Sequence, residues 1–192
     1  GDLGEHRMMT PSLTAALVDA EVIHDHEAIR AAIEGIADAV RADYDNGTPP
    51  PLYVTVMNGG MPFASDLAMA LGARGLDLEF DYLHATRYRG QTSGSGLAWL
   101  HRPATSMRGR RVLLADDILD EGHTMLAVKR WCEDQGAEDV RIAVLAEKVH
   151  DRCVEGICAD YIGLQVPDRY VFGYGMDYHE QGRNLPAIYA LK

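Results

Sequence analysis

The sequence predicts an α/β protein with a mainly parallel central sheet flanked by helices. Short apolar runs without polar alternation are typical of strands buried on both faces, and three such runs cover residues 52–57, 111–116 and 140–146. Apolar residues at helical spacing follow the first two runs, at residues 61–71 and 123–135. Because strands that alternate with helices favour a parallel sheet, we expect a ligand site beyond the carboxyl ends of the first two strands.

The N-terminal part of the chain predicts two helices. Residues 14–20 form a short helical pattern, and a longer one runs through residues 29–40. His24-Asp25-His26 precedes the longer pattern. Two histidines around an acid are also a metal-binding pattern, but Asp25 directly before a helix is better explained as its N-cap.

The remaining segments predict further strands. Strand-like residues at 77–85 and a return strand at 97–100 flank residues 86–96, a run of small and polar residues that also fits a disordered hairpin loop. A short strand is expected at 159–162. Since the chain shows no internal repeat, low-complexity tract or linker, we expect one domain over residues 1–192.

Composition and charge narrow the class of function. The 192 residues are 47% hydrophobic, which fits a globular domain with a sizeable core. The formal net charge of −11 disfavours nucleic-acid binding, and no apolar run approaches the ~20 residues of a membrane span. The low, odd count of three cysteines predicts reduced thiols and a cytoplasmic location. Residues 1–9 begin with Gly and lack the apolar core of a signal peptide, so we expect a cloning remnant or disorder there.

The most informative stretch is VLLADDILDEGHTM, at residues 112–125. Its strand feeds directly into a helix, which leaves the first helical N–H groups without internal partners. With Gly122 in the turn and the Thr124 hydroxyl nearby, these groups form a socket for a phosphate. The carboxylates beside it would repel a phosphate unless they bind sugar hydroxyls and Mg²⁺, for which carboxylate oxygens are suitable ligands. The candidate residues are Asp116, Asp117, Asp120, Glu121, Gly122, His123 and Thr124.

Each of these signals also has a plainer interpretation. Acids in a first helical turn are common because they stabilise the helix. Asn58-Gly59-Gly60, after the first strand, is either a second anion-binding junction or a simple glycine turn. Lys148, at the end of the third strand, lies where open α/β sheets bind ligands, or it is only solvated.

The stretch at 112–125 resembles the phosphoribosyl pyrophosphate signature of the type I phosphoribosyltransferases. Other segments narrow the resemblance to the hypoxanthine-guanine phosphoribosyltransferase family: VMNGGMPFASDL at 56–67, LHATRYRG at 83–90 and VPDRYVFGYGMDYHEQGRNLP at 166–186. The resemblance runs from about residue 13 to the end of the chain. It implies the type I phosphoribosyltransferase fold, with a small hood from residues 150–192 and part of the N-terminus, and a mobile lid at 85–98.

The resemblance also implies how the sugar and the pyrophosphate are bound. Asp116 and Asp117 face the ribose hydroxyls and Mg²⁺, residues 120–124 hold the 5-phosphate, and Asp177 is a further metal ligand. A cis peptide bond is expected between Met57 and Asn58. Asn58 is neutral where many members have Lys, so backbone N–H groups are the expected ligands there. The residues expected at the pyrophosphate are Asn58, Gly59 and Arg183.

For the purine, the resemblance implies a stacked and hydrogen-bonded site. Lys148 donates to the exocyclic oxygen, Tyr170 stacks on the base, and Val171 offers backbone groups to its edge, beside Asp177. From the residues alone, Tyr170 would be a packing residue and Arg183 a surface residue. The lid residues are Arg87 and Tyr88.

The implied reaction transfers a 5-phosphoribosyl group from phosphoribosyl pyrophosphate to hypoxanthine or guanine, giving IMP or GMP and pyrophosphate, with Mg²⁺ as cofactor. Asp120 is expected to take a proton from the purine ring. The sequence leaves open a xanthine-preferring or hypoxanthine-only enzyme. A ligand-sensing regulator that keeps the fold is a further alternative, although one that binds nucleic acid would need a basic face. The family resemblance implies a homodimer or homotetramer.

Overall fold

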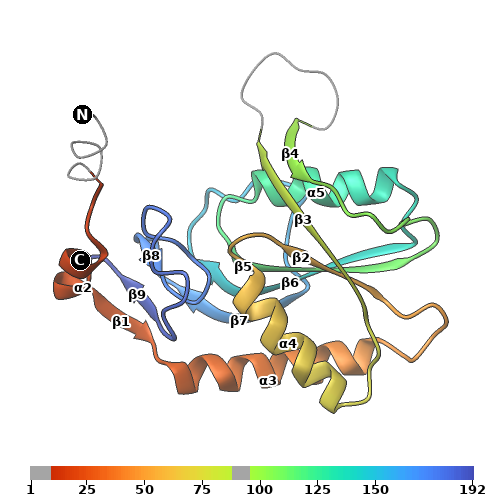
Figure 1. The fold of residues 1–192 in the computed structure, drawn as a ribbon, viewed down its shortest axis with the longest axis horizontal. Helices are drawn as coiled ribbons and strands as arrows, with labels where there is room; N and C mark the ends of the chain where they lie inside the picture. Colours follow the sequence, from red (N-terminus) through yellow and green to blue (C-terminus); the bar gives the residue numbers. More distant parts are fainter. Residues whose placement is uncertain (1–9, 88–95) are drawn as a thin grey trace, which may run out of the picture.

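The computed structural model describes residues 10–87 and 96–192, which form two sheets and the helices around them. The main sheet has the strand order β4-β3-β2-β5-β6-β7, and all its pairs are parallel except that between β3 and β4 (Figure 1). The α/β class and the mainly parallel sheet predicted from the sequence are thus confirmed. The strands are β2 (Leu52–Val56), β3 (Glu79–Arg87), β4 (Leu97–His101), β5 (Arg111–Leu119), β6 (Asp139–Lys148) and β7 (Tyr161–Val166).

Helices cover both faces of this sheet: α3 and α4 pack on one face and α5 on the other (Figure 1). In β5, Leu113 and Ala115 enter the core beneath α3 and α4, whereas Val112 and Leu114 enter the core beneath α5. This burial on both sides explains the unbroken apolar runs in the sequence. None of the helices in residues 10–87 and 96–192 combines the length and apolarity that a membrane crossing requires. The helices are α2 (Leu13–Asp19), α3 (His26–Asp43), α4 (Met61–Ala73) and α5 (His123–Asp134).

Helix boundaries follow local signals in the sequence. Asp25 caps α3, because its carboxylate accepts a hydrogen bond from the Ala28 N–H at 2.8 Å, which confirms the predicted N-cap. α5 begins directly after Gly122, with a φ of 83°, and Gly136, with a φ of 91°, lies just beyond its end. Glycine lacks the Cβ that disfavours this left-handed conformation, so it suits both boundaries.

β5 is longer than the apolar run predicts. The sequence indicates a strand at residues 111–116, whereas the strand continues to Leu119 and pairs with β6 as far as Glu147. Asp117, which the sequence places after the strand, therefore lies within it, as Asp116 does. Acidic residues are poor strand formers, but β6 supplies hydrogen-bond partners along this stretch, and the pairing overrides the local preference.

The N- and C-terminal segments form a second, antiparallel sheet with the order β1-β9-β8. We call this sheet, together with the loop at residues 173–187, the hood. Figure 1 shows the hood at the end of the molecule that also carries α2 and the C-terminus. The hood strands are short, and no periodic pattern in the sequence predicts them. They are β1 (Glu21–His24), β8 (Val171–Phe172) and β9 (Ile188–Ala190).

Candidate active site

The carboxyl ends of β2 and β5 lie side by side, since Thr55 pairs with Ala115 in parallel register. β2 leads into α4 through the turn at residues 57–60, and the Met57–Asn58 peptide bond in this turn is cis, as predicted. A Cβ on Gly60 would lie 2.7 Å from the carbonyl oxygen of Ala115. Only glycine therefore lets this turn approach β5 so closely.

Asp116 and Asp117 are half-buried carboxylates at this edge of the sheet. Asp116 Oδ1 accepts from the Asp117 N–H at 2.8 Å, and Asp117 Oδ1 accepts from the Ile118 N–H at 2.7 Å. Burial and the charge of its neighbour raise the pKa of Asp116 well above its ordinary value, and burial raises the pKa of Asp117, although Arg183 lowers both. Raised pKa values at two adjacent carboxyls mean that the protein alone stabilises their ionised forms poorly. The pair therefore favours a cation or hydroxyl donors as ligands.

The hood loop closes over these acids. Arg183 Nη1 donates to the Gly175 carbonyl oxygen at 2.7 Å, and Arg183 Nη2 lies 3.1 Å from Glu180 Oε2. A Cβ on Gly175 would overlap the Gly59 carbonyl oxygen, and a Cβ on Gly59 would overlap the Asp117 carboxylate and lie 3.2 Å from Arg183 Nη1. Gly59 and Arg183, two of the three residues predicted at the pyrophosphate, thus lie next to Asp117 of β5.

Asp177 lies in the hood loop, and Tyr170 directly precedes the hood strand β8. Asp177 Oδ1 is 4.0 Å from Arg183 Nη2, and its Oδ2 accepts from the Glu180 N–H at 3.0 Å. The Tyr170 hydroxyl donates to the Asp177 carbonyl oxygen at 3.3 Å, and its ring stacks with that of His179 at a centroid distance of 6.4 Å. The Tyr170 side chain is nevertheless 45% exposed, so it offers ring surface to a ligand.

β5 passes into α5 through residues 120–122. The N-cap residue of α5 is Gly122, which has no side chain that could accept from the first N–H groups of the helix. These groups are therefore available to bind an anion. A Cβ on Gly122 would lie 2.7 Å from Ile157 Cγ2, because the loop after β6 packs against this turn. Tyr88, one of the two predicted lid residues, lies outside the described residues. A cavity of about 490 Å³ opens at this junction, and its lining includes Arg87, Asp116, Asp120, Glu121, Gly122, His123 and Thr124.

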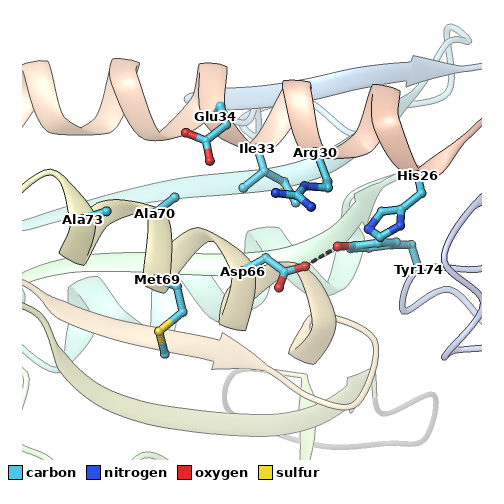
Figure 2. A pocket seen from close by; sticks show the side chains of 9 residues that line it. All are labelled: His26, Arg30, Ile33, Glu34, Asp66, Met69, Ala70, Ala73 and Tyr174. Carbon is cyan, nitrogen blue, oxygen red and sulfur yellow. Dashed lines mark hydrogen bonds between the residues drawn. The ribbon is translucent and has the colours of Figure 1, made fainter.

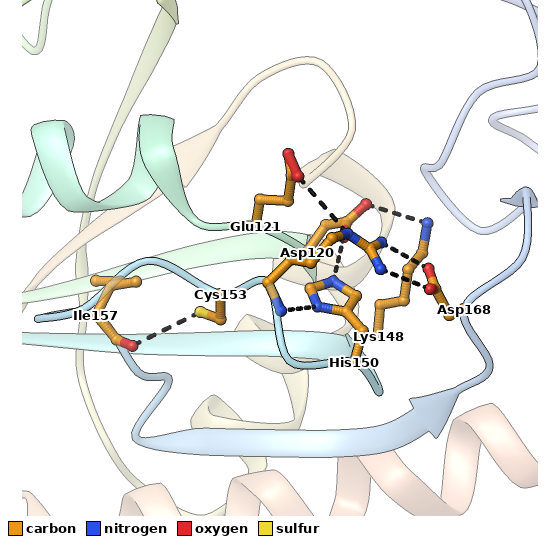
Figure 3. A network of polar contacts seen from close by, with 8 residues as sticks. Asp120, Glu121, Lys148, His150, Cys153, Ile157 and Asp168 are labelled. Atoms are coloured by element: carbon orange, nitrogen blue, oxygen red, sulfur yellow. Dashed lines mark hydrogen bonds and ion pairs between the residues drawn. The ribbon is translucent and has the colours of Figure 1, made fainter.

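Asp120 lies within a polar cluster at the end of β6 (Figure 3). Lys148 Nζ is 3.0 Å from Asp120 Oδ2, and His150 Nε2 is 2.6 Å from Asp120 Oδ1. Burial raises the pKa of Asp120, but hydrogen bonds from His150 and Lys148 outweigh it, so the pKa lies below its ordinary value. Asp120 is therefore ionised near neutral pH. His150 was not among the predicted residues; the only signal in the sequence is its spacing of two from Lys148, which puts both side chains on one side of an extended chain.

Arg152 links this cluster to the segment before β8, and it was not among the predicted residues either. Its guanidinium donates to both carboxylate oxygens of Asp168, at 2.7 and 2.8 Å, and its Nε lies 3.8 Å from Glu121 Oε1. Asp168 precedes the predicted purine residues Tyr170 and Val171. The Val171 side chain is buried at the start of β8, so only backbone groups of this residue can face a ligand.

A second cavity, of about 360 Å³, lies between α3 and α4 and is lined by none of the predicted site residues (Figure 2). The Tyr174 hydroxyl donates to the carboxylate of Asp66 on α4, and the His26 ring lies 6.3 Å from the Tyr174 ring. Burial raises the pKa of Tyr174, so its phenol keeps the proton that it donates. This contact fixes the hood loop on α4 next to Gly175.

Asp116 and Asp117 suit a particular kind of metal binding. In the described part of the chain, no group of three or more His, Cys, Asp or Glu is arranged to hold a metal ion. Mg²⁺, however, usually keeps several waters and binds through one or two carboxylates together with substrate phosphates. Asp116 and Asp117 fit that role, because a cation would stabilise their ionised forms. Asp177 is the more distant candidate: it lies near the same arginine, Arg183, at 4.0 Å.

Comparison with known proteins agrees with this geometry. Residues 19–180 match the family model of the phosphoribosyl transferase domain. A hypoxanthine-guanine phosphoribosyltransferase of Streptococcus pneumoniae strain R6 is 33% identical over 173 residues, which cover 90% of this chain and 93% of that protein. A hypoxanthine phosphoribosyltransferase structure from Staphylococcus aureus superposes with a TM-score of 0.83 at 28% identity, over 95% of this chain and 97% of the other. A variant of the Trypanosoma cruzi enzyme, complexed with the product IMP, gives 0.82 at 26% identity, over 91% and 92% of the two chains. This chain therefore belongs to the phosphoribosyl transferase family.

Proposed function

We propose that this phosphoribosyltransferase acts in purine salvage and transfers a 5-phosphoribosyl group from phosphoribosyl pyrophosphate to hypoxanthine or guanine. The observation that carries the proposal is the gathering of three features at one edge of the main sheet. These are the open N–H groups of α5, the acids of β5, and the glycine turn with Arg183. Phosphoribosyl pyrophosphate has a phosphate at one end of its ribose and a pyrophosphate at the other. The N–H groups of α5 suit the phosphate, the acids of β5 suit the ribose hydroxyls, and the glycine turn with Arg183 suits the pyrophosphate. The names of the bacterial relatives support the choice of purine.

In this reaction the bond between ribose C1′ and a pyrophosphate oxygen breaks, and its electron pair leaves on the pyrophosphate. A bond forms between C1′ and a ring nitrogen of the purine. The N–H groups at the start of α5 hold the 5-phosphate, and Asp116 and Asp117 accept from the ribose hydroxyls. Asn58 and Gly59, through their backbone N–H groups, and Arg183 bind the leaving pyrophosphate. Mg²⁺, when held by Asp116, Asp117 and Asp177, would neutralise the pyrophosphate as a Lewis acid.

One proton is transferred at the purine end of the site. The ring N–H of the purine gives its proton to the Asp120 carboxylate as the nitrogen attacks. Lys148 donates to the exocyclic oxygen of a 6-oxopurine, a group that adenine lacks. Tyr170 stacks on the base and Val171 meets its edge with backbone groups. This arrangement favours hypoxanthine and guanine over adenine.

The direct test is the release of pyrophosphate by the purified protein. Phosphoribosyl pyrophosphate and Mg²⁺ are mixed with hypoxanthine, guanine, xanthine or adenine in parallel, and the nucleotide product is identified by mass spectrometry. We expect IMP or GMP with an equal amount of pyrophosphate, little product from adenine, and no reaction after chelation of Mg²⁺. Absence of pyrophosphate release with every 6-oxopurine would refute the proposal, and release from xanthine alone would change the substrate.

Asp120→Asn tests the proposed base. The amide cannot take the ring proton, so we expect kcat to fall by ~10²-fold or more. Binding of phosphoribosyl pyrophosphate, measured by calorimetry, should persist because the open N–H groups of α5 are unchanged. Near-normal turnover would remove Asp120 from this role.

The proposal includes a homodimer or homotetramer in the cytoplasm. Met61, Met69, Phe80 and Tyr82 are exposed apolar side chains that line a cavity of about 280 Å³. Met57, in the turn at the pyrophosphate end, also lines this cavity, so a second copy bound here would cover apolar surface next to the site. All three cysteines are free, which suits a reducing compartment. Light scattering should give a dimer or tetramer for the native chain and a smaller mass for Phe80→Glu; a native monomer would refute the assembly.

A further inference from the structure

The Asp120 carboxylate has a separate partner for each of its oxygens. Oδ1 faces His150 Nε2 at 2.6 Å, and Oδ2 faces Lys148 Nζ at 3.0 Å (Figure 3). The His150 side chain is only 3% exposed, whereas that of Lys148 is 14% exposed. The imidazole therefore sits in a fixed, water-shielded place, while the Lys148 ammonium is on a flexible stem.

The proton of the His150 ring is located by its second contact. The backbone N–H of Arg152 donates to His150 Nδ1 at 3.0 Å. An N–H donor requires a lone pair on Nδ1, so the ring is the neutral tautomer that carries its proton on Nε2. His150 Nε2–H thus donates to Asp120 Oδ1 and does not compete with Asp120 for the purine proton.

Arg152, whose N–H fixes this tautomer, is itself held by two acidic residues. The Arg152 guanidinium forms two hydrogen bonds to Asp168, at 2.7 and 2.8 Å, and approaches Glu121 Oε1 to 3.8 Å. Val154 N–H also donates to the Glu121 carbonyl oxygen at 2.9 Å. The loop that carries His150 is therefore fastened to the turn that carries Asp120.

We propose that His150 is a positioning residue that holds Asp120 Oδ1, so that Oδ2 receives the purine proton once Lys148 moves to the exocyclic oxygen. This inference rests on the proposed function. When the Lys148 ammonium moves from Oδ2 toward the exocyclic oxygen, its departure frees the oxygen that must accept the proton. At that moment the hydrogen bond from His150 is what keeps the carboxylate aimed at the ring nitrogen. The proton passes from the purine nitrogen to Oδ2, and His150 keeps its own.

Two isosteric variants separate positioning from packing. In His150→Gln the side-chain amide reaches the place of Nε2 and still donates to Asp120, whereas in His150→Asn it reaches only the place of Nδ1 and serves Arg152. We expect His150→Asn to lower kcat with hypoxanthine by about 10-fold or more, because a hydrogen bond to a charged group is lost. His150→Gln should stay within a few-fold of the native kcat, and KM for phosphoribosyl pyrophosphate should change little in both. His24→Leu is a matched control: it removes a histidine at the end of the hood strand β1, whose Nε2 lies 2.7 Å from the Gln165 carbonyl oxygen in β7, and it should leave the kinetics unchanged.

A double-mutant cycle with Asp120→Asn completes the test. If His150 acts through Asp120, His150→Asn in the Asp120→Asn background should cause no further loss of kcat. The positioning role would be overturned by any of three results. These are additive losses of kcat in the double variant, the same kcat in His150→Asn and His150→Gln, and a native kcat in a folded His150→Asn protein. Thermal melting followed by circular dichroism shows that the variants are folded. A native protein that releases no pyrophosphate would instead refute the proposed function, so the two failures are distinguishable.

Discussion

Gly175 tests how the hood loop is held over the turn after β2. Its φ is 99°, and an added Cβ would overlap the Gly59 carbonyl oxygen and lie 3.5 Å from Asp117 Cβ. For Gly175→Ala, the left-handed backbone costs about 1–2 kcal/mol, and overpacking against a backbone oxygen costs about 1–3 kcal/mol more. We therefore expect a loss of about 2–5 kcal/mol in the free energy of unfolding, with loss of activity because the hood loop must move away from the acids.

Two other glycines serve as controls that separate the backbone cost from the overpacking cost. Gly75 has a φ of 79° and no atom within 4 Å of an added Cβ, so Gly75→Ala measures the backbone term alone, about 1–2 kcal/mol. Gly35, inside α3, has neither a positive φ nor a close neighbour, so Gly35→Ala should stabilise the protein by about 0.5–1 kcal/mol. Urea unfolding gives the three free energies, and pyrophosphate release gives the activities. If Gly175→Ala costs no more than Gly75→Ala and keeps full activity, the close contact between the hood and the turn is not required.

Other predictions follow from the same contacts. Gly59→Ala should keep the fold but displace the Asp117 carboxylate, which its Cβ would overlap, so kcat with saturating substrates should fall while the melting temperature changes little; unchanged kinetics would contradict this. Tyr174→Phe removes the hydrogen bond to Asp66 and should lower the free energy of unfolding by about 1–3 kcal/mol in urea titrations, whereas an equal stability would show that the contact is dispensable. Because hydrogen bonds hold the pKa of Asp120 below its ordinary value, Asp120 should stay ionised until the pH falls through that lowered pKa. An acid limb above the usual aspartate range that persists in Asp120→Asn is expected from Asp116 and Asp117, whose pKa values are raised, whereas such a limb that disappears in Asp120→Asn would contradict the lowered pKa of Asp120.

The sequence predicts best those features that depend on neighbours in the chain. The burial of β5 is visible as an apolar run, and the N-cap Asp25 and the helix start after Gly122 depend on residues a few positions away. The strand expected at 77–85 is found at Glu79–Arg87, and that expected at 159–162 is found at Tyr161–Val166. These shifts arise because pairing with a neighbouring strand, rather than local composition, determines where a strand ends.

Features that depend on distant partners are not predicted from local patterns. β8 comprises only Val171 and Phe172, and it exists because these residues pair with β9, near the end of the chain. His150 gains its role from Asp120, which is 30 residues earlier in the chain. Arg183 reaches the acids of β5 only because the hood folds over them, so composition alone would rank it as a surface residue.

The distribution of paired charge explains how an acidic chain can bind a polyphosphate. At the end of the site proposed for the purine, the acids are neutralised within the protein, since Lys148 pairs with Asp120 and Arg152 pairs with Asp168. At the end proposed for the ribose, Asp116 and Asp117 keep raised pKa values despite Arg183, so a further positive charge would stabilise their ionised forms there. A polyphosphate that arrives with its own cation therefore brings the charge that this edge lacks, whereas a neutral purine meets an end that is already balanced. The net charge of −11 thus disfavours extended nucleic-acid backbones without disfavouring one small anion bound together with a metal ion.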